Sequence, residues 1–132
     1  MEKNIAACGN DCGACPRHLP KTEAELNRTA ELWMKIGYRD RIVSSEEISC
    51  TGCSPDNWCR YHVNRCVSAK QISDCGKCGL YPCAVIEECF AVTQSFAPSC
   101  RTACSPEEYD RMVKAFFEKK KNLDQSARER RD

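Results

Sequence analysis

The chain has 132 residues, with 20 basic against 19 acidic side chains, and its formal net charge is +1 at pH 7. This balance provides no general attraction to nucleic acid or to anionic lipid. The mean hydropathy is −0.59, and no apolar run approaches the roughly 18 residues of a membrane helix. The N-terminal residues lack the apolar core of a signal peptide, so we expect a cytoplasmic protein that folds as one domain.

The unusual feature of the composition is its 13 cysteines. In a secreted chain this density indicates disulfides, whereas in a reducing cytosol it indicates metal binding or redox chemistry. The odd count also prevents complete pairing within the chain. We therefore predict a metal-binding protein and keep a disulfide scaffold as the less favoured alternative.

The first cysteines along the chain form an N-terminal cluster of the order C-x3-C-x2-C-P, made of Cys8, Cys12, Cys15 and Pro16. Gly9 and Gly13 each follow a cysteine, where a positive φ would turn backbone N–H groups toward the sulfur. Three thiolates do not complete a tetrahedral structural site. We therefore expect a fourth ligand from elsewhere in the chain.

Residues 22–36 are predicted to form the first helix. The pattern Thr22-x-x-Glu25 is a capping box, and Gly37 is a typical stop signal. Trp33 lies on the apolar stripe of this helix, and we predict that it belongs to the core. The following residues, 38–47, are predicted to form a polar connection.

The central segment, residues 50–83, holds seven cysteines, two C-x2-C pairs and few aliphatic side chains. Two such pairs can clamp one tetrahedral ion, because each pair places two sulfurs across a tight turn. We expect metal rather than apolar packing to fold this segment. The predicted ligands of the whole chain are Cys8, Cys12, Cys15, Cys50, Cys53, Cys59, Cys66, Cys75, Cys78 and Cys83.

The simplest grouping of these ligands places Cys50, Cys53, Cys75 and Cys78 at one site. The N-terminal cluster would then take Cys83 or Cys66 at a second site, with Cys59 in the metal region but unassigned. Gly79 is expected to supply a turn, and Lys77 to offset negative charge on the sulfurs. His62 is either an imidazole ligand or a surface residue.

The predicted metal is zinc, with two ions, because closed all-thiolate tetrahedral sites favour it. The alternative is a [4Fe–4S] cluster, which thiolate-only ligand sets also suit.

A second helix is predicted to start at Tyr81-Pro82-Cys83 and to end at Pro98. Its expected buried stripe carries Cys89 as a core thiol and comprises Val85, Cys89, Val92 and Phe96. Cys100 and Cys104 are assigned to a short loop, as spare thiols or as a further half-site.

A third helix is predicted from the capping box Ser105-Pro106-Glu107-Glu108. The segment from 119 to 132 is charged and almost free of apolar residues, so we expect a mobile tail after a cysteine-rich metal-binding domain over 1–118. The predicted fold class is small, metal-stabilised and mainly α. Three amphipathic helices would surround cysteine loops with little strand.

Five blocks of the sequence occur in a recognisable order. They are the stretch from Cys8 to Pro16, Cys50-Thr-Gly-Cys53, the region from Cys59 to Cys66, Cys75-Gly-Lys-Cys78 and Tyr81-Pro82-Cys83. Together they resemble a family of small cysteine-rich bacterial and archaeal proteins of unknown function. The resemblance implies metal binding, with zinc as the metal, and implies no activity. The sequence departs from the pattern at His62, where another cysteine is expected.

Two functions are compatible with this sequence. The first is a structural zinc-binding protein that acts as an interaction module for an unknown protein partner. The alternative is an iron–sulfur or thiol redox protein, which the surplus of cysteines favours. We find no phosphate-binding glycine loop, no Ser/His/Asp set and no paired carboxylates. We therefore predict no catalytic residues, and an enzyme is not favoured. Basic residues do not gather on the cysteine loops, so nucleic acid is not favoured as a partner either.

Overall fold

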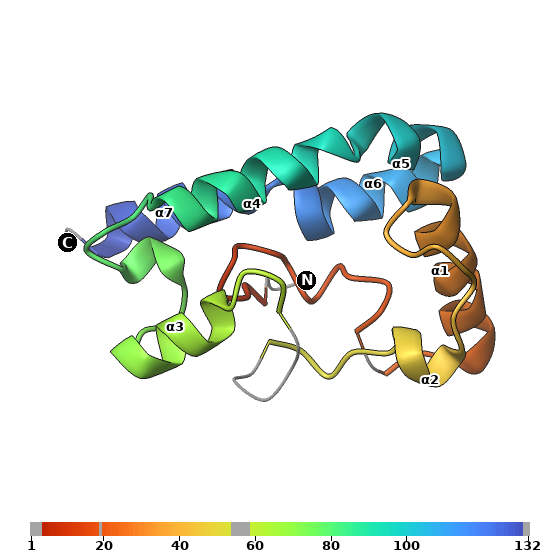
Figure 1. The fold of residues 1–132 in the computed structure, drawn as a ribbon, viewed down its shortest axis with the longest axis horizontal. Coiled ribbons are helices and arrows are strands. Elements are labelled where there is room, and N and C mark those ends of the chain that lie inside the picture. Colours follow the sequence, from red (N-terminus) through yellow and green to blue (C-terminus); the bar gives the residue numbers. More distant parts are fainter. Residues whose placement is uncertain (1–3, 19, 54–58, 131–132) are drawn as a thin grey trace.

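The computed structural model describes residues 4–18, 20–53 and 59–130, and Figure 1 shows their arrangement. The elements are α1 (Glu23–Ile36), α2 (Ser45–Ile48), α3 (Val63–Lys70), the 3-10 turn η1 (Cys75–Lys77), α4 (Ala84–Ser95), α5 (Ala97–Ala103), α6 (Pro106–Met112), the π-helical turn η2 (Val113–Phe117) and α7 (Lys119–Arg130). Among the described residues, β-structure is limited to two isolated bridges. The prediction of a small, mainly helical fold is confirmed. No helix in these ranges is long and apolar enough to cross a membrane.

Helix α1 begins and ends where its local signals predict. The Thr22 hydroxyl accepts the N–H of Glu25 at 3.2 Å, and the Glu25 carboxylate accepts the N–H of Thr22 at 3.1 Å. Gly37 ends the helix at φ 106°, a left-handed conformation that glycine adopts without strain. Trp33 is 3 % exposed, so its predicted place in the core is confirmed.

The first apolar cluster joins α1 to α2, α5 and α6. Trp33 stands at its centre, in edge-to-face contact with Tyr38 at 5.2 Å and with Phe116 at 5.8 Å between ring centroids. Cys100 is fully buried in the same cluster. The prediction of a loop around Cys100 was wrong, because these residues form α5 and their apolar side chains complete the cluster.

The second apolar cluster lies under the central segment. Val63 and Val67 of α3 meet three residues from outside that segment, Ala7, Ile86 and Leu123. The central segment is indeed poor in aliphatic residues, but its few apolar side chains pack against apolar residues of the N-terminal loop, of α4 and of α7. Apolar packing therefore contributes more to this region than the sequence suggested.

Helix α4 differs from the prediction at both ends. Cys83 is its N-cap, so Pro82 precedes the helix instead of opening it. Pro98 lies in the first turn of α5, where its missing N–H costs no helical hydrogen bond. The buried residues of α4 are Ile86 and Cys89, whereas Val85 is 45 % exposed. The predicted stripe was wrong at Val85, whose place Ile86 takes, whereas Val92 and Phe96 are partly buried and the prediction of Cys89 as a core thiol is confirmed.

Residues 119–130, expected to belong to a mobile tail, form helix α7, and residues 131–132 lie outside the described ranges. Leu123 is fully buried, and the Asn122 amide donates to the carbonyl of Gly9 at 2.9 Å. A methyl group at Gly9 would lie 2.6 Å from the carbonyl oxygen of Lys119, and one at Gly76 would lie 2.5 Å from that of Leu123. Because Gly9 and Gly76 have no side chain, the backbone of α7 can pack closely against the cysteine loops. Leu123 is the fully buried apolar residue of this helix, whereas Ala127 is partly buried.

Candidate metal centre

The N-terminal cysteine loop lies beside the start of the central segment. His18 and Cys50 form a parallel bridge, in which the N–H of Cys50 donates to the carbonyl of Arg17 at 2.9 Å. This contact brings the pair Cys12 and Cys15 to the pair Cys50 and Cys53. Burial, followed by the neighbouring thiols of Cys15, Cys50, Cys8 and Cys53, raises the pKa of Cys12 to about 12. We call Cys12, Cys15, Cys50 and Cys53 the first thiol group.

Backbone N–H groups point at sulfurs of the first thiol group. The N–H of Gly52 lies 3.4 Å from the Sγ of Cys50, and Gly52 has φ 110°. Burial raises the pKa of Cys15, and the N–H groups of Arg17 and His18 oppose this by favouring its thiolate. Such N–H···S bonds orient and stabilise metal-bound thiolates.

The expected role of the two N-terminal glycines is half right. Gly9 has φ 95°, as predicted, but Gly13 is not among the residues with positive φ. The turn after Cys12 is instead held by the Asp11 carboxylate, which accepts the N–H of Gly13 at 3.0 Å.

A second thiol group forms between α3 and α4. Cys66 comes from α3, Cys75 opens η1, Cys78 follows it and Cys83 caps α4. Burial raises the pKa of Cys75 to about 12, and the neighbouring thiols of Cys8, Cys83, Cys66 and Cys78 add to the shift. We call Cys66, Cys75, Cys78 and Cys83 the second thiol group.

Lys70 supplies the positive charge of the second thiol group. Its Nζ lies 3.0 Å from the Sγ of Cys78, and this bond raises the pKa of Lys70, with smaller contributions from the thiols of Cys66 and Cys83. The expectation that Lys77 has this role was wrong. The Lys77 ammonium instead donates a hydrogen bond to the backbone carbonyl of Ser126 at 3.2 Å. The sequence held a usable signal, because Lys70 follows Cys66 by one helical turn and therefore shares its face.

A third set of thiols lies between the two groups. The thiols of Cys8 and Cys89 share a hydrogen bond, and Cys59 lies near both Cys89 and Cys53. The bond from Cys89 lowers the pKa of Cys8; burial opposes this and the charge of Lys119 supports it. The thiol of Cys8 also helps to raise the pKa of Cys12 and of Cys75, so Cys8 lies within electrostatic range of both groups.

The structure corrects the grouping expected from the sequence. Cys50 and Cys53 lie with Cys12 and Cys15 and not with the pair at 75 and 78, because the bridge to His18 selects the N-terminal loop as their neighbour. Cys66 and Cys83 join the pair at 75 and 78. All ten predicted ligands thus lie in or beside the two groups or the third set.

The two histidines lie in different surroundings. His62 is an exposed residue at the start of α3 with φ 58°, in agreement with the surface alternative. The Nδ1 of His18 is buried without a hydrogen-bond partner among the described residues, and its ring borders Gly52, between Cys50 and Cys53 of the first thiol group.

In the part of the chain that the structure describes, no three His, Cys, Asp or Glu side chains stand in the geometry of a closed metal site. The donor chemistry of the thiol groups nevertheless fits a soft or borderline tetrahedral cation, because each group offers four sulfurs and N–H or ammonium donors that stabilise thiolates.

The fold and the thiol groups define a small, cysteine-rich helical protein. The chain belongs to the family described as Protein of unknown function (DUF3795), whose family model matches residues 4–88. The match covers both thiol groups and ends inside α4. No curated protein and no solved structure matches the chain.

Proposed function

We propose that this protein binds two zinc ions at structural four-thiolate sites. The observation that supports this most directly is the meeting of two C-x2-C pairs from distant parts of the chain in the first thiol group. Four thiolates from two such pairs are the ligand set of closed tetrahedral zinc sites. The second thiol group would hold the other ion, with Lys70 offsetting part of the negative charge that four thiolates carry.

Zinc bound in this way supplies cross-links and no catalysis, because a closed site leaves no position for a substrate. In zinc-finger peptides the ion contributes about 10–16 kcal/mol, comparable with the whole stability of a domain, about 5–15 kcal/mol. The two apolar clusters are small, so ions at the thiol groups would decide whether the cysteine loops hold their shape.

Elemental analysis of protein purified under reducing conditions tests the proposal. We expect about two zinc ions per chain and a partial loss of the helical circular dichroism signal, from unfolding of α3 and η1, when a strong chelator removes them. A metal-free protein with an unchanged spectrum and unchanged thermal stability would contradict it. A brown protein that contains iron and acid-labile sulfide would show that the thiol groups hold an iron–sulfur cluster instead of zinc.

Double variants test the grouping of the ligands. Cys12→Ser with Cys50→Ser should lose one ion, since both residues serve one site, whereas Cys50→Ser with Cys75→Ser should lose both. The grouping expected from the sequence places Cys50 and Cys75 at one site, so it predicts that the second variant loses one ion only. Cys104→Ser, outside both groups, is the control and should keep the full zinc content.

Thiol redox chemistry is the second candidate function, and the pair Cys8 and Cys89 favours it. The Cys89 hydrogen bond and the charge of Lys119 favour the thiolate of Cys8, and a thiolate is the nucleophilic form of cysteine. Oxidation would join the two sulfurs and pass two electrons and two protons to a glutathione-type disulfide. Alkylation of Cys8 should then be fast at pH 7 and slower in Cys89→Ala. Equal rates in the two proteins would exclude this role.

A protein partner remains part of the proposal. Leu80 is 71 % exposed and Val85 is 45 % exposed, on either side of Cys83 in the second thiol group. Exposed large apolar side chains can mark an interaction surface. The double variant Leu80→Ser, Val85→Ser should keep its zinc and lose a partner that binds the wild-type chain; unchanged binding would exclude this surface.

A further inference from the structure

A cavity of about 350 Å³ lies where the N-terminal loop, the end of α1, the end of α4 and the start of α7 come together. This volume is in the range of small-molecule sites. Four basic side chains line it, Arg17, Arg39, Arg60 and Lys119, while no acidic residue of the described chain does. We call it the basic cavity.

The hydrogen bonds of these cations end on neutral oxygens. Arg17 and Arg39 each donate to a backbone carbonyl, at 2.6 and 3.0 Å, and Lys119 donates to the hydroxyl of Thr93 at 2.6 Å. The Arg60 guanidinium lies over the ring of Tyr61, 5.5 Å from its centroid. Neutral partners orient the positive charges without cancelling them.

The neighbouring charges confirm an excess of positive potential. Burial, followed by the charge of Arg17, lowers the pKa of Arg39, and the more distant Glu47 offsets this in part. Lys119 also faces the thiols of Cys8 and Cys89. The guanidinium groups of Arg17 and Arg39 thus repel each other in the partly buried wall of the cavity. A bound anion would relieve this repulsion.

Two polar atoms of the cavity wall have no partner. The Oδ1 of Asn10 and the hydroxyl of Tyr61 are both buried, and neither makes a hydrogen bond to the described residues. Buried polar atoms without partners are rare because they cost free energy. Both atoms belong to side chains that line the basic cavity, so a ligand with a donor and an acceptor would satisfy them.

Part of the cavity wall is aromatic. Trp33, Tyr38 and Phe96 line the cavity, with the Tyr38 ring 4.7 Å from that of Phe96 and 5.2 Å from that of Trp33. Aromatic edges and faces of this kind pack against a flat ring. The cavity wall therefore combines positive charge with aromatic surface.

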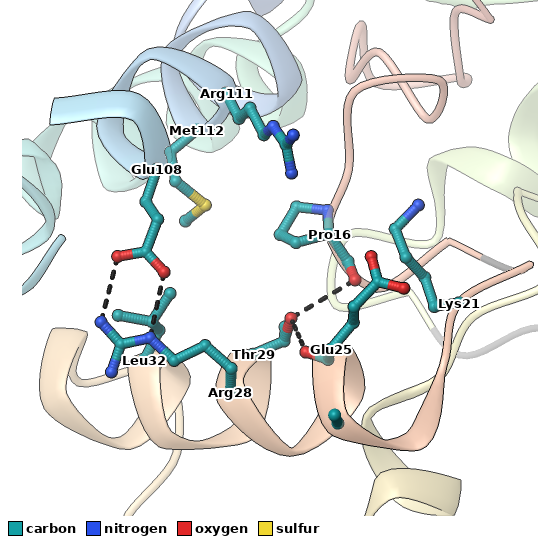
Figure 2. Close-up of a pocket in the computed structure, with 10 residues that line it drawn as sticks. Pro16, Lys21, Glu25, Arg28, Thr29, Leu32, Glu108, Arg111 and Met112 are labelled. Atoms are coloured by element: carbon teal, nitrogen blue, oxygen red, sulfur yellow. Dashed lines mark hydrogen bonds and ion pairs between the residues drawn. The ribbon is translucent and has the colours of Figure 1, made fainter. Parts of the chain in front are cut away.

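A cavity between α1 and α6 lacks this character. It measures about 330 Å³ and is drawn in Figure 2, where Glu108 and Arg28 face each other and are joined by two bonds. Its three cations, Lys21, Arg28 and Arg111, are opposed by two carboxylates, Glu25 and Glu108. Carboxylates in the wall would repel an anion, so the basic cavity suits an anion better than this one does.

From this we infer that the basic cavity is a binding site for a small molecule that joins a phosphate group to a flat ring, as in a mononucleotide. Arginine guanidinium groups suit phosphate because they present paired donors to its oxygens. The ring would pack on the aromatic wall, and its polar edge would reach the Asn10 oxygen. The site borders the cysteine loops, because Arg17 acts on the thiol of Cys15 and Lys119 on that of Cys8, but no predicted metal ligand of the described chain lines it.

Calorimetric titration of the full-length, metal-loaded protein tests the inference. The probes are the four ribonucleoside monophosphates and p-nitrophenyl phosphate, compared with adenosine and with inorganic phosphate. We expect at least one phosphate ester to bind about tenfold more tightly than either comparison compound, and its affinity to fall as salt is raised. Failure of every ester to bind at millimolar concentration would overturn the inference, as would equal affinity for inorganic phosphate.

Matched variants locate the site. Arg39→Gln should weaken binding about tenfold or more, whereas Arg41→Gln, whose guanidinium lies outside the cavity and pairs with Glu47 at 3.3 Å, should change it less than about twofold. Lys119→Gln and Lys120→Gln form a second pair, since Lys120 binds Asp124 instead. Equal losses within both pairs would contradict the assignment.

Tyr61→Phe separates binding from folding. Its hydroxyl has no protein partner in the described structure, so removing it should leave thermal stability unchanged or slightly raised while ligand affinity falls. A variant that loses stability and keeps affinity would show that the hydroxyl is structural and would count against the site.

Discussion

Lys70 and Cys78 lie close together across the edge of the second thiol group, with Nζ 3.0 Å from Sγ. An ammonium at this distance offsets the negative charge of a metal-bound thiolate. Lys70→Met should therefore speed transfer of one zinc ion to a competing chelator by about tenfold. Lys70→Arg should restore much of the retention.

Lys77→Met is the matched control for this prediction. Lys77 lies next to Cys78 in the sequence, but its ammonium binds the carbonyl of Ser126 and the carboxylate of Glu129. We expect zinc release from this variant to match the wild type. Faster release from Lys77→Met than from Lys70→Met would show that sequence proximity, and not the observed contact, governs the charge balance.

The docking of α7 depends on Leu123, which is fully buried among Val67, Ile86 and Cys89. Leu123→Ala should lower the free energy of unfolding by about 2–4 kcal/mol, because the lost burial leaves a cavity. Urea denaturation followed by circular dichroism measures this change. Lys121→Ala, on the exposed side, should alter it by less than about 0.5 kcal/mol. An unchanged free energy of unfolding in Leu123→Ala would contradict the docking of α7 and favour a mobile tail.

Two glycines of η1 and its neighbourhood give an internally controlled test of the α7 contact. A Cβ at Gly76 would lie 2.5 Å from the Leu123 carbonyl oxygen, whereas a Cβ at Gly79 would meet nothing within 4 Å. Gly76→Ala should therefore destabilise the protein by about 2 kcal/mol or more. Gly79→Ala should be neutral or slightly stabilising, since it restricts the unfolded chain. Similar thermal unfolding midpoints for both variants would contradict the contact.

The ion pair of Arg28 and Glu108 joins α1 to α6 and should depend on pH. Two bonds of 3.0 Å from Arg28, aided by the N–H of Ser105, lower the pKa of Glu108 from 4.5 to about 2. Because the folded pKa lies below the unfolded one, the stabilisation is complete above about pH 4.5 and is lost as pH falls toward 2.

Glu108→Gln should consequently cost about 1 kcal/mol at pH 7, a modest value because solvent screens the 43 % exposed Arg28 side chain. The difference from wild type should shrink toward zero near pH 2, measured by urea denaturation of metal-free samples at each pH. Glu31→Gln, at the weaker 3.4 Å contact with Arg28, is the control. A difference that persists undiminished at low pH would exclude the ion pair as its source.

Local sequence signals predicted several elements correctly. The capping boxes at Thr22 and Ser105 and the stop at Gly37 are present as expected. These signals work because the bonds that cap a helix join residues three or four positions apart, so the same few side chains decide the structure wherever the helix is placed. The C-x2-C spacings likewise pick out the four cysteines of the first thiol group and Cys75 and Cys78 of the second.

The partners of those cysteines were decided by the tertiary structure. Nothing within the Cys50 motif specifies that its neighbour is the N-terminal loop, and the bridge to His18 depends on how the chain crosses itself. The burial of Leu123 also depends on contacts between distant segments. It requires α7 to pack closely against the loops that contain Gly9 and Gly76. A charged segment with one well-placed leucine has the composition of a tail until a partner surface buries that leucine.

The sequence by itself thus determined that this is a small helical protein rich in thiols, since composition and short spacings act locally. Only the tertiary structure decided which thiols lie together, which lysine accompanies them and that four basic residues from separate segments surround one cavity. The physical reason is that grouping arises from contacts between distant segments, whose free energy depends on packing and chain crossing rather than on any local pattern.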